Sequence, residues 1–306
     1  MKREALVAEI VSTPWALPPD RLAVMAGVVA RWYSGTPRAM DDEDYGRQKT
    51  AYEMRREQAA RMSAGGVAVV SCYGVIVQRA GMMTEWCGGT STQQLTAWLR
   101  ELERDEAVQQ ILMDYDTPGG SVYGVAEAGA EIRRIKAVKP IVGISNSLCA
   151  SAGYWLGSQC SEFYITPGGE AGSIGVYQMF QSWAKYMEEL GVDTKFLSAG
   201  KYKVEGNPYQ PLSEDAEAFL VSRVKEYYDE FVSAVAKGRG VSVEAVRNGM
   251  GQGRVLGAQA CVAEKMADGV MTFEEVMRKM QRSIKTGTNA PRSRLNSAQR
   301  DIDILT

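Results

Sequence analysis

The sequence predicts an α/β fold in which strands and helices alternate around a largely parallel sheet. Apolar β-rich runs begin near residues 67, 108, 140 and 162. Segments with the apolar spacing of helices, each about a dozen residues long, lie between the first three of these runs. The chain has 306 residues and is 45% hydrophobic, which is enough to bury a sizeable core.

Residues 1–35 have the apolar spacing of a helix, which includes Trp15 and a segment that starts at Pro18. A charged helix is expected from Gln48 to Met62. Too few core-forming residues lie in this region for it to fold alone. We therefore predict a helical N-terminal arm over residues 1–62.

Apolar β-rich runs begin after Gly65, and the main domain is predicted to span residues 63–282. Its strands are expected at 67–77, 108–115, 140–145 and 162–166. A turn at 117–120 is expected to end the second strand. Residues 283–306 are polar and aperiodic, which predicts a flexible tail.

Helix starts in this domain are marked by capping residues. Ser91 begins a capping box before the first helix, and a second helix is expected to reach Val138. Ser213 caps a long helix that should stop near Gly238. Two shorter helices are expected after it, and Thr272 begins the last with another capping box.

Composition excludes several classes of function. The chain contains no histidine, so a catalytic imidazole is impossible. The net charge of −2 and the lack of a basic run argue against nucleic acid as a partner. The five cysteines form no CxxC pair, so we expect no metal site, no cofactor and a reducing compartment.

The N-terminal region has no apolar run of membrane-spanning length. Its longest apolar stretch, Ala23–Ala30, is far shorter than the roughly 20 residues that cross a bilayer. No secretory signal is recognisable either. We therefore expect a cytoplasmic protein without membrane contacts.

Three short segments are candidates for chemistry. The glycine pair Gly119–Gly120 could turn backbone N–H groups toward a ligand oxygen, although Ser121 could equally cap a helix after an ordinary turn. Ser151 lies among small residues at a strand-to-helix junction, which suits a nucleophile or a packing seam. Cys149 is a weaker nucleophile candidate, because no histidine could activate it.

The third segment is Gly200–Lys203. Most lysines are surface residues, so Lys203 alone would indicate nothing. Without histidine, however, a lysine is the most plausible general base for a serine. A lysine can do this near neutral pH only where burial favours its uncharged form.

Five segments in order resemble the signal peptide peptidase A family of Ser-Lys peptidases, which have the ClpP/crotonase fold. The resemblance spans about residues 65–275 and rests on Thr117–Gly120, Ala150–Tyr154, Ala171–Val176, Gly200–Lys203 and Gly253–Ala260. It implies a ClpP/crotonase-like fold of βαβ units and a peptidase domain over residues 63–282. No single segment is specific, but five in register are a strong signal.

The resemblance also implies roles for individual residues. Ser151 matches the nucleophile and Lys203 the general base, while Ser173 matches a serine that holds the lysine amine. The oxyanion hole would be formed by Gly119, Gly120 and the N–H of Ala152. Two residues depart from the family pattern: Ala152 replaces a glycine, and Thr117 replaces a serine.

Within that family the chain is most similar to the phage capsid-assembly branch of the lambda C-protein type. This similarity implies a homo-oligomeric ring acting in the host cytoplasm or inside proheads. Scaffold, portal and capsid proteins would be the substrates. Two alternatives stay open: a cytosolic bacterial peptidase that degrades short peptides, and a crotonase-fold acyl-CoA enzyme or inactive assembly module.

Overall fold

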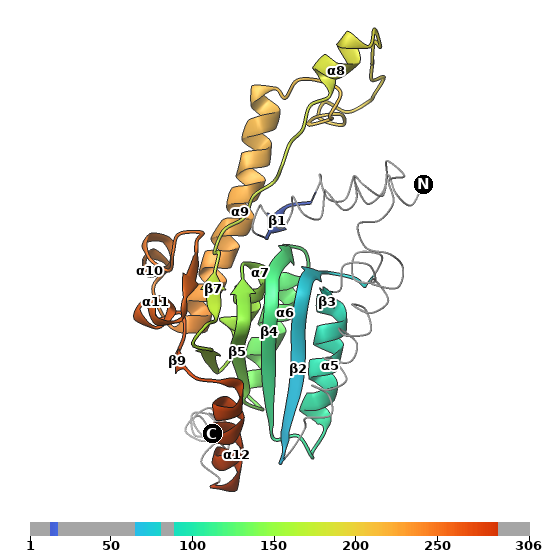
Figure 1. Ribbon diagram of the computed structural model, residues 1–306. Helices are drawn as coiled ribbons and strands as arrows, with labels where there is room; N and C mark the ends of the chain where they lie inside the picture. Colours follow the sequence, from blue (N-terminus) through green and yellow to red (C-terminus); the bar gives the residue numbers. More distant parts are fainter. Residues whose placement is uncertain (1–12, 18–64, 81–88, 287–306) are drawn as a thin grey trace, which may run out of the picture.

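The computed structural model describes residues 13–17, 65–80 and 89–286. Nine strands in these residues form one sheet, whose main path runs β3-β2-β4-β5-β6-β9 (Figure 1). Every pairing along that path is parallel, which confirms the predicted α/β class. The strands are β1 (Trp15–Ala16), β2 (Val67–Val77), β3 (Gly89–Ser91), β4 (Gln110–Ser121), β5 (Ile141–Ala150), β6 (Glu162–Ile165), β7 (Glu170–Gly172), β8 (Val255–Gly257) and β9 (Gly269–Val270).

Helices cover both faces of the sheet. On one face α5, α6, α7 and α9 pack over a large apolar core, which includes Ile111, Met113 and Phe231. On the other face α12 packs against a smaller cluster, which includes Leu112 and Ile144. The helices are α5 (Thr92–Arg104), α6 (Val125–Lys136), α7 (Ala152–Gly157), α8 (Ala184–Glu189), α9 (Glu214–Arg239), α10 (Val243–Asn248), α11 (Ala258–Ala263) and α12 (Phe273–Lys285).

The predicted helix caps are present. The side chains of Ser91 and Ser213 accept hydrogen bonds from the first turns of α5 and α9. Thr272 and Glu275 form a reciprocal capping box at α12. Helix α9 ends slightly later than expected, at a left-handed Gly240. Up to residue 286, where the described part of the chain ends, three helices follow it rather than two, and α12 continues past the predicted boundary at residue 282.

Three local expectations are wrong. Residues 117–120 do not form a turn but extend β4, because they pair with β2 on one side and β1 on the other. Trp15 and Ala16 form a strand instead of a helix, because β4 offers them an unpaired edge. Helix α6 ends before Val138, which is exposed. Residues 1–12, 18–64 and 287–306, with the rest of the predicted arm and the tail, lie outside the described part of the chain.

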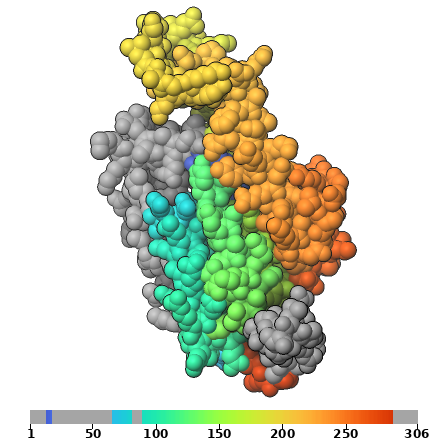
Figure 2. Space-filling model, turned by 180° about the vertical axis from the view of Figure 1, so that it is seen from behind, coloured from blue at the N-terminus to red at the C-terminus, as the bar shows by residue number. Residues whose placement is uncertain are grey.

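Residues 178–213 form an arm that projects from the body together with the first half of α9 (Figures 1 and 2). Large apolar side chains of this region are exposed, and Leu197 reaches 90% exposure. The second half of α9 is different, since Phe231 and Val235 are fully buried against the core. Within the described residues, the apolar side chains of α9 are therefore buried along its second half, while Phe219 and Val221 in its first half are exposed.

None of the described helices combines the length and the apolar character needed to cross a membrane.

Asp114 is an acidic side chain buried in the middle of β4. The hydroxyl of Tyr73 donates a hydrogen bond to one of its carboxylate oxygens, and the other oxygen has no partner among the described residues. Burial, with the nearby Asp116 as a smaller contribution, raises the pKa of the Asp114 carboxyl to about 6. The Asp114 carboxyl therefore holds its proton more tightly in the folded protein than in the unfolded chain.

We expect Asp114→Asn to stabilise the protein at neutral pH. The wild type loses stability as pH rises from the unfolded-state pKa of 3.8 through the folded-state pKa of about 6. A shift of this size corresponds to about 3 kcal/mol at pH 7.5. Asparagine still accepts the Tyr73 hydrogen bond but carries no charge, so the pH-dependent loss of stability should disappear. Urea unfolding between pH 4 and 8 would measure the free energy of unfolding of both proteins. An Asp114→Asn protein less stable than wild type at pH 7.5 would contradict the argument.

Candidate active site

Three parallel strands end together and gather most of the predicted site residues. The segment Gly119–Gly120 lies at the end of β4, and Ser151 directly follows β5. The N–H of Ser151 donates to the carbonyl of Gly172 at the end of β7, at 2.7 Å. Ser173 therefore comes next to the same junction. Carboxyl ends of parallel strands meet at one edge of a sheet, which is why residues far apart in sequence converge here.

Ser151 has an unusual backbone conformation, with φ 54° and ψ −117°. Residues other than glycine rarely adopt a positive φ, and such backbone strain costs on the order of 1–3 kcal/mol. The side chain is 1% exposed, and its hydroxyl has no hydrogen-bond partner among the described residues. A strained, buried and unpartnered hydroxyl is unusual in a merely structural serine.

The sharp turn at Ser151 is held by the packing of α7. Gly153 lets this helix approach β4 closely, because a Cβ there would lie only 2.4 Å from the Thr117 methyl group. Trp155 stacks on Phe231 of α9 with ring centroids 4.6 Å apart. The hydroxyl of Tyr154 donates to the carbonyl of Met266 at 2.9 Å. Ser151 is thus fixed by contacts on several sides of the helix that it begins.

The glycine pair lies immediately beside Ser151. Gly119 has a φ of 101°, and a Cβ there would be 2.9 Å from the Cβ of Ser151. A Cβ on Gly120 would overlap the carbonyl oxygen of Ile76, at 1.8 Å. Glycine is therefore required at both positions, and the backbone of β4 comes as close to the serine as an oxyanion hole would need.

Thr117 explains how β4 keeps this shape. Its hydroxyl donates to the Gly74 carbonyl at 2.6 Å and accepts from the Gly119 N–H at 3.0 Å. The pairing register between β2 and β4 shifts at this point. Since the Gly119 N–H is bound to Thr117, the Gly120 N–H is the better placed of the two to face a ligand. Threonine thus serves where the family pattern has serine.

Lys203 is not part of this cluster within one chain. It lies in the turns between α8 and α9, on the projecting arm, and is exposed to solvent. The nearby Lys201 is also exposed, with its ammonium 4.7 Å from the centre of the Tyr202 ring. The structure therefore brings together Gly119, Gly120, Ser151, Ala152 and Ser173, but leaves the predicted base outside.

Cys149 is a poor alternative nucleophile. Its side chain is fully buried, and this burial raises the pKa of the thiol well above its ordinary value. A thiol attacks only as the thiolate, which burial of this kind disfavours.

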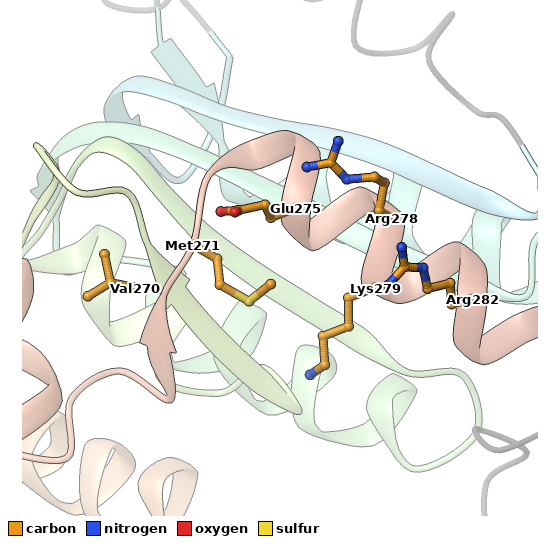
Figure 3. Close-up of a pocket in the computed structure, with 6 residues that line it drawn as sticks. All are labelled: Val270, Met271, Glu275, Arg278, Lys279 and Arg282. Carbon is orange, nitrogen blue, oxygen red and sulfur yellow. The ribbon is translucent and has the colours of Figure 1, made fainter.

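A separate pocket lies between β9 and α12 (Figure 3). Its lining residues are Val270, Met271, Glu275, Arg278, Lys279 and Arg282. Lys279 is already paired with Glu162 and the hydroxyl of Tyr164. The pocket contains none of the predicted site residues, and Figure 1 shows α12 at the opposite end of the molecule from the arm.

Residues 133–286 match the sequence model of peptidase family S49. The chain belongs to this family. The matched region includes Ser151, Ala152, Ser173 and Lys203, whereas the glycine pair at 119–120 precedes it. Family membership agrees with the resemblance inferred from the five sequence segments.

Curated relatives include both phage and bacterial proteins. Capsid assembly protease C of Escherichia phage lambda is 29% identical over 258 residues, which is 84% of this chain and 55% of the relative. Head-tail preconnector protein GP5 of Enterobacteria phage P21 is 28% identical over 72% of this chain and 44% of its own length. A putative signal peptide peptidase SppA of Enterococcus faecium is 28% identical over 63% and 56%. The chain thus spans about half the length of these relatives.

One feature of the site was missed from sequence. The strand β1 lies against Gly120 and Ser121, so that Trp15 and Ala16 are part of the site's surroundings. Pro14 and Pro18 were signals for an extended conformation, because a proline disfavours helix at the preceding residue, here Thr13 and Leu17. Nothing in residues 13–17 indicates which distant strand they pair with.

Proposed function

We propose that this chain is a serine endopeptidase with Ser151 as nucleophile and Lys203 as general base. The observation that carries the proposal is the conformation of Ser151, strained and unpartnered at the strand edge beside Gly119 and Gly120. Membership of peptidase family S49 supports the same chemistry.

The geometry suggests how the reaction would proceed. The Ser151 hydroxyl attacks a peptide carbonyl carbon and gives its proton to the neutral amine of Lys203. The N–H groups of Gly120 and Ala152 stabilise the negative charge that develops on the carbonyl oxygen. The lysine then protonates the departing amine, and water hydrolyses the acyl-enzyme by the reverse roles. Ser173, which follows Gly172 beside Ser151, would hold the lysine amine.

The base is proposed to come from a neighbouring copy of the chain. In one chain Lys203 is exposed on the arm, while Ser151 is buried at the sheet edge. The same arm exposes many large apolar side chains, including Trp183, Tyr186 and Leu197. Exposed apolar surface of this kind marks an interaction site. An arm that packs on the next copy would bury that surface and bring in the lysine, and repetition would close a ring.

Phage prohead maturation is the biological role that we propose. Two relatives are phage proteins, and one of them is named a capsid assembly protease. The substrates would be scaffold, portal and capsid-associated proteins in the host cytoplasm or inside proheads. The Enterococcus relative favours one alternative, a bacterial peptidase that degrades short peptides. Portal and major capsid genes beside this gene would support the phage role, and their absence would favour the alternative.

A fluorophosphonate probe tests the chemistry directly. This reagent forms a covalent bond with activated serines, so mass spectrometry should find the adduct on the peptide that contains Ser151. Ser158 is a matched internal control, because it is also buried but its hydroxyl bonds to the Trp155 carbonyl at 2.8 Å. Lack of any adduct at Ser151 after prolonged incubation of the oligomeric protein would argue for an inactive assembly module or an acyl-CoA enzyme.

A further inference from the structure

The strand β1 is held on both of its edges. On one side it pairs antiparallel with β4, with Trp15 opposite Ser121 and Ala16 opposite Gly120. On the other side Trp15 and Tyr177 exchange two backbone hydrogen bonds, of 2.8 and 3.0 Å. Figure 1 shows β1 at the end of the sheet where β4 ends. The groove between β4 and Tyr177 is thus filled by an extended piece of the chain itself.

The register places one particular carbonyl in front of the glycine pair. The N–H of Val122 donates to the Pro14 carbonyl at 3.3 Å. Facing pairs in an antiparallel ladder alternate between bonded and non-bonded, so the pair two residues on, Ala16 and Gly120, is again bonded. The Gly120 N–H therefore points at the Ala16 carbonyl oxygen.

That carbonyl also lies beside the proposed nucleophile. A Cβ on Gly119 would be 2.3 Å from the Ala16 oxygen and 2.9 Å from the Cβ of Ser151. The two groups are therefore neighbours at the same point of the backbone. A peptide about to be cleaved would present its carbonyl in this way, to the oxyanion-hole donor and the serine together.

The fit of the side chains is close. Ala16 is 0% exposed and Trp15 is 1% exposed, so both are enclosed by the body of the protein. A residue larger than alanine opposite Gly120 would have to displace its surroundings. Addition of an extended peptide to a strand edge is a common mode of peptide recognition, in which pockets for side chains give specificity.

We propose that residues 13–17 occupy the peptide-binding groove of this chain in the manner of a substrate, with Ala16 preceding the position of the bond to be cut. The inference rests on the proposed peptidase function. It gives the substrate class as an extended peptide with a small residue in front of Ser151. A substrate must displace the strand, so the groove is closed for as long as residues 13–17 stay in place.

When residues 13–17 occupy the groove of their own chain, they lower its apparent affinity for any other peptide. If the groove is open in a fraction of the molecules, the apparent dissociation constant rises by the inverse of that fraction. A strand that is in place 90% of the time would thus weaken binding about tenfold. Release of the strand would strengthen peptide binding by the same factor.

A reversible disulfide across β1 tests this directly. Trp15 and Tyr177 face each other in a bonded antiparallel pair, whose Cα atoms are about 5.5 Å apart, within disulfide range. In Trp15→Cys/Tyr177→Cys, oxidation should lock the strand and reduction should free it. We expect fluorophosphonate labelling of Ser151 to fall at least about tenfold on oxidation and to recover on reduction. Tyr177→Cys alone, treated identically, is the matched control.

The outcomes separate the two hypotheses. Equal labelling of the locked and reduced forms would overturn the occupation of the groove while leaving the peptidase function standing. Lack of labelling in every form, wild type included, would instead overturn the proposed nucleophile. If the double variant does not fold, Ala16→Trp serves in its place. A tryptophan cannot fit opposite Gly120, so labelling should then be faster than in wild type, and an unchanged rate would contradict the inference.

The substrate class has its own measurement. Two fluorogenic peptides, Thr-Pro-Trp-Ala-Leu and Thr-Pro-Trp-Phe-Leu, would be compared on the reduced double variant. We expect cleavage after alanine to be at least about tenfold faster, because the enclosed position of Ala16 fits alanine, whereas a phenylalanine side chain would have to displace its surroundings. Equal cleavage of the two peptides would show that Ala16 does not mark the position before the cut.

Discussion

Ser151→Ala is expected to lower peptide hydrolysis about a million-fold, as removal of a nucleophile does in serine peptidases. The loss should appear in kcat, because the hydroxyl acts on the reacting carbon and not in substrate binding. The fold should be kept. The Ser151 hydroxyl makes no hydrogen bond within the described residues, so its removal breaks none of these, and alanine fills the same buried space.

Ser158→Ala is a matched control for this variant. Ser158 is buried at the end of the same short helix, but its hydroxyl is bound to the Trp155 carbonyl. Its removal should cost about 1 kcal/mol of stability and leave turnover near the wild-type rate. Casein cleavage and urea unfolding would be measured for both variants. A Ser151→Ala protein with more than a few per cent of wild-type activity would exclude Ser151 as nucleophile.

Lys203→Ala is expected to be as inactive as Ser151→Ala, and an equal mixture of the two proteins should regain activity. If the base comes from a neighbouring copy, each site combines a serine of one chain with a lysine of another. Random assortment in a closed ring then gives intact pairs in roughly a quarter of the sites. If each chain used its own lysine, no mixed site could be complete.

This experiment needs evidence that subunits exchange. Native mass spectrometry of differently tagged chains would supply it, and activity would be read from the same samples. Exchange without recovery would contradict a shared site. Recovery to about a quarter of the wild-type rate would establish it and would explain why the arm stands apart from Ser151.

Two further substitutions fix which lysine acts. Lys203→Arg should be inactive, because a guanidinium keeps its proton in proteins. Lys201→Ala should retain most activity, because the ammonium of Lys201 lies over the Tyr202 ring of its own chain. The reverse pattern, with Lys201→Ala inactive and Lys203→Ala active, would mean that the wrong lysine has been matched to the family.

The closed groove and the shared base would act together during assembly. A single chain has β1 beside Ser151, while Lys203 is exposed on the arm. Under the two proposals, either condition alone would suppress cleavage. Both conditions can be relieved only by other molecules or by movement of residues 13–17. Under these proposals, an isolated chain would be an inactive precursor that gains activity only on assembly.

The fold class, the helix caps and the order of the site segments could be predicted from the amino-acid sequence. These depend on local patterns: apolar periodicity for the strands, and oxygen-bearing side chains at Ser91, Ser213 and Thr272 for the helix starts. The absence of histidine reduced the possible bases to few residue types. Small residues and a strand-to-helix change made Ser151 a candidate, and the family resemblance gave it the role of nucleophile.

The residues that surround Ser151 could not be predicted in this way, because they are brought together by long-range packing. Strand β1 pairs with residues of β4 more than 100 positions away along the chain, and the extension of β4 also depends on pairing with Val75 and Ile76 of β2. No local propensity specifies such pairings. The exposed position of Lys203 is likewise set by the fold, because this residue lies on an arm that projects from the body and exposes large apolar side chains. Long-range pairing and burial are properties of the folded molecule, and the local sequence records only which residues are available for them.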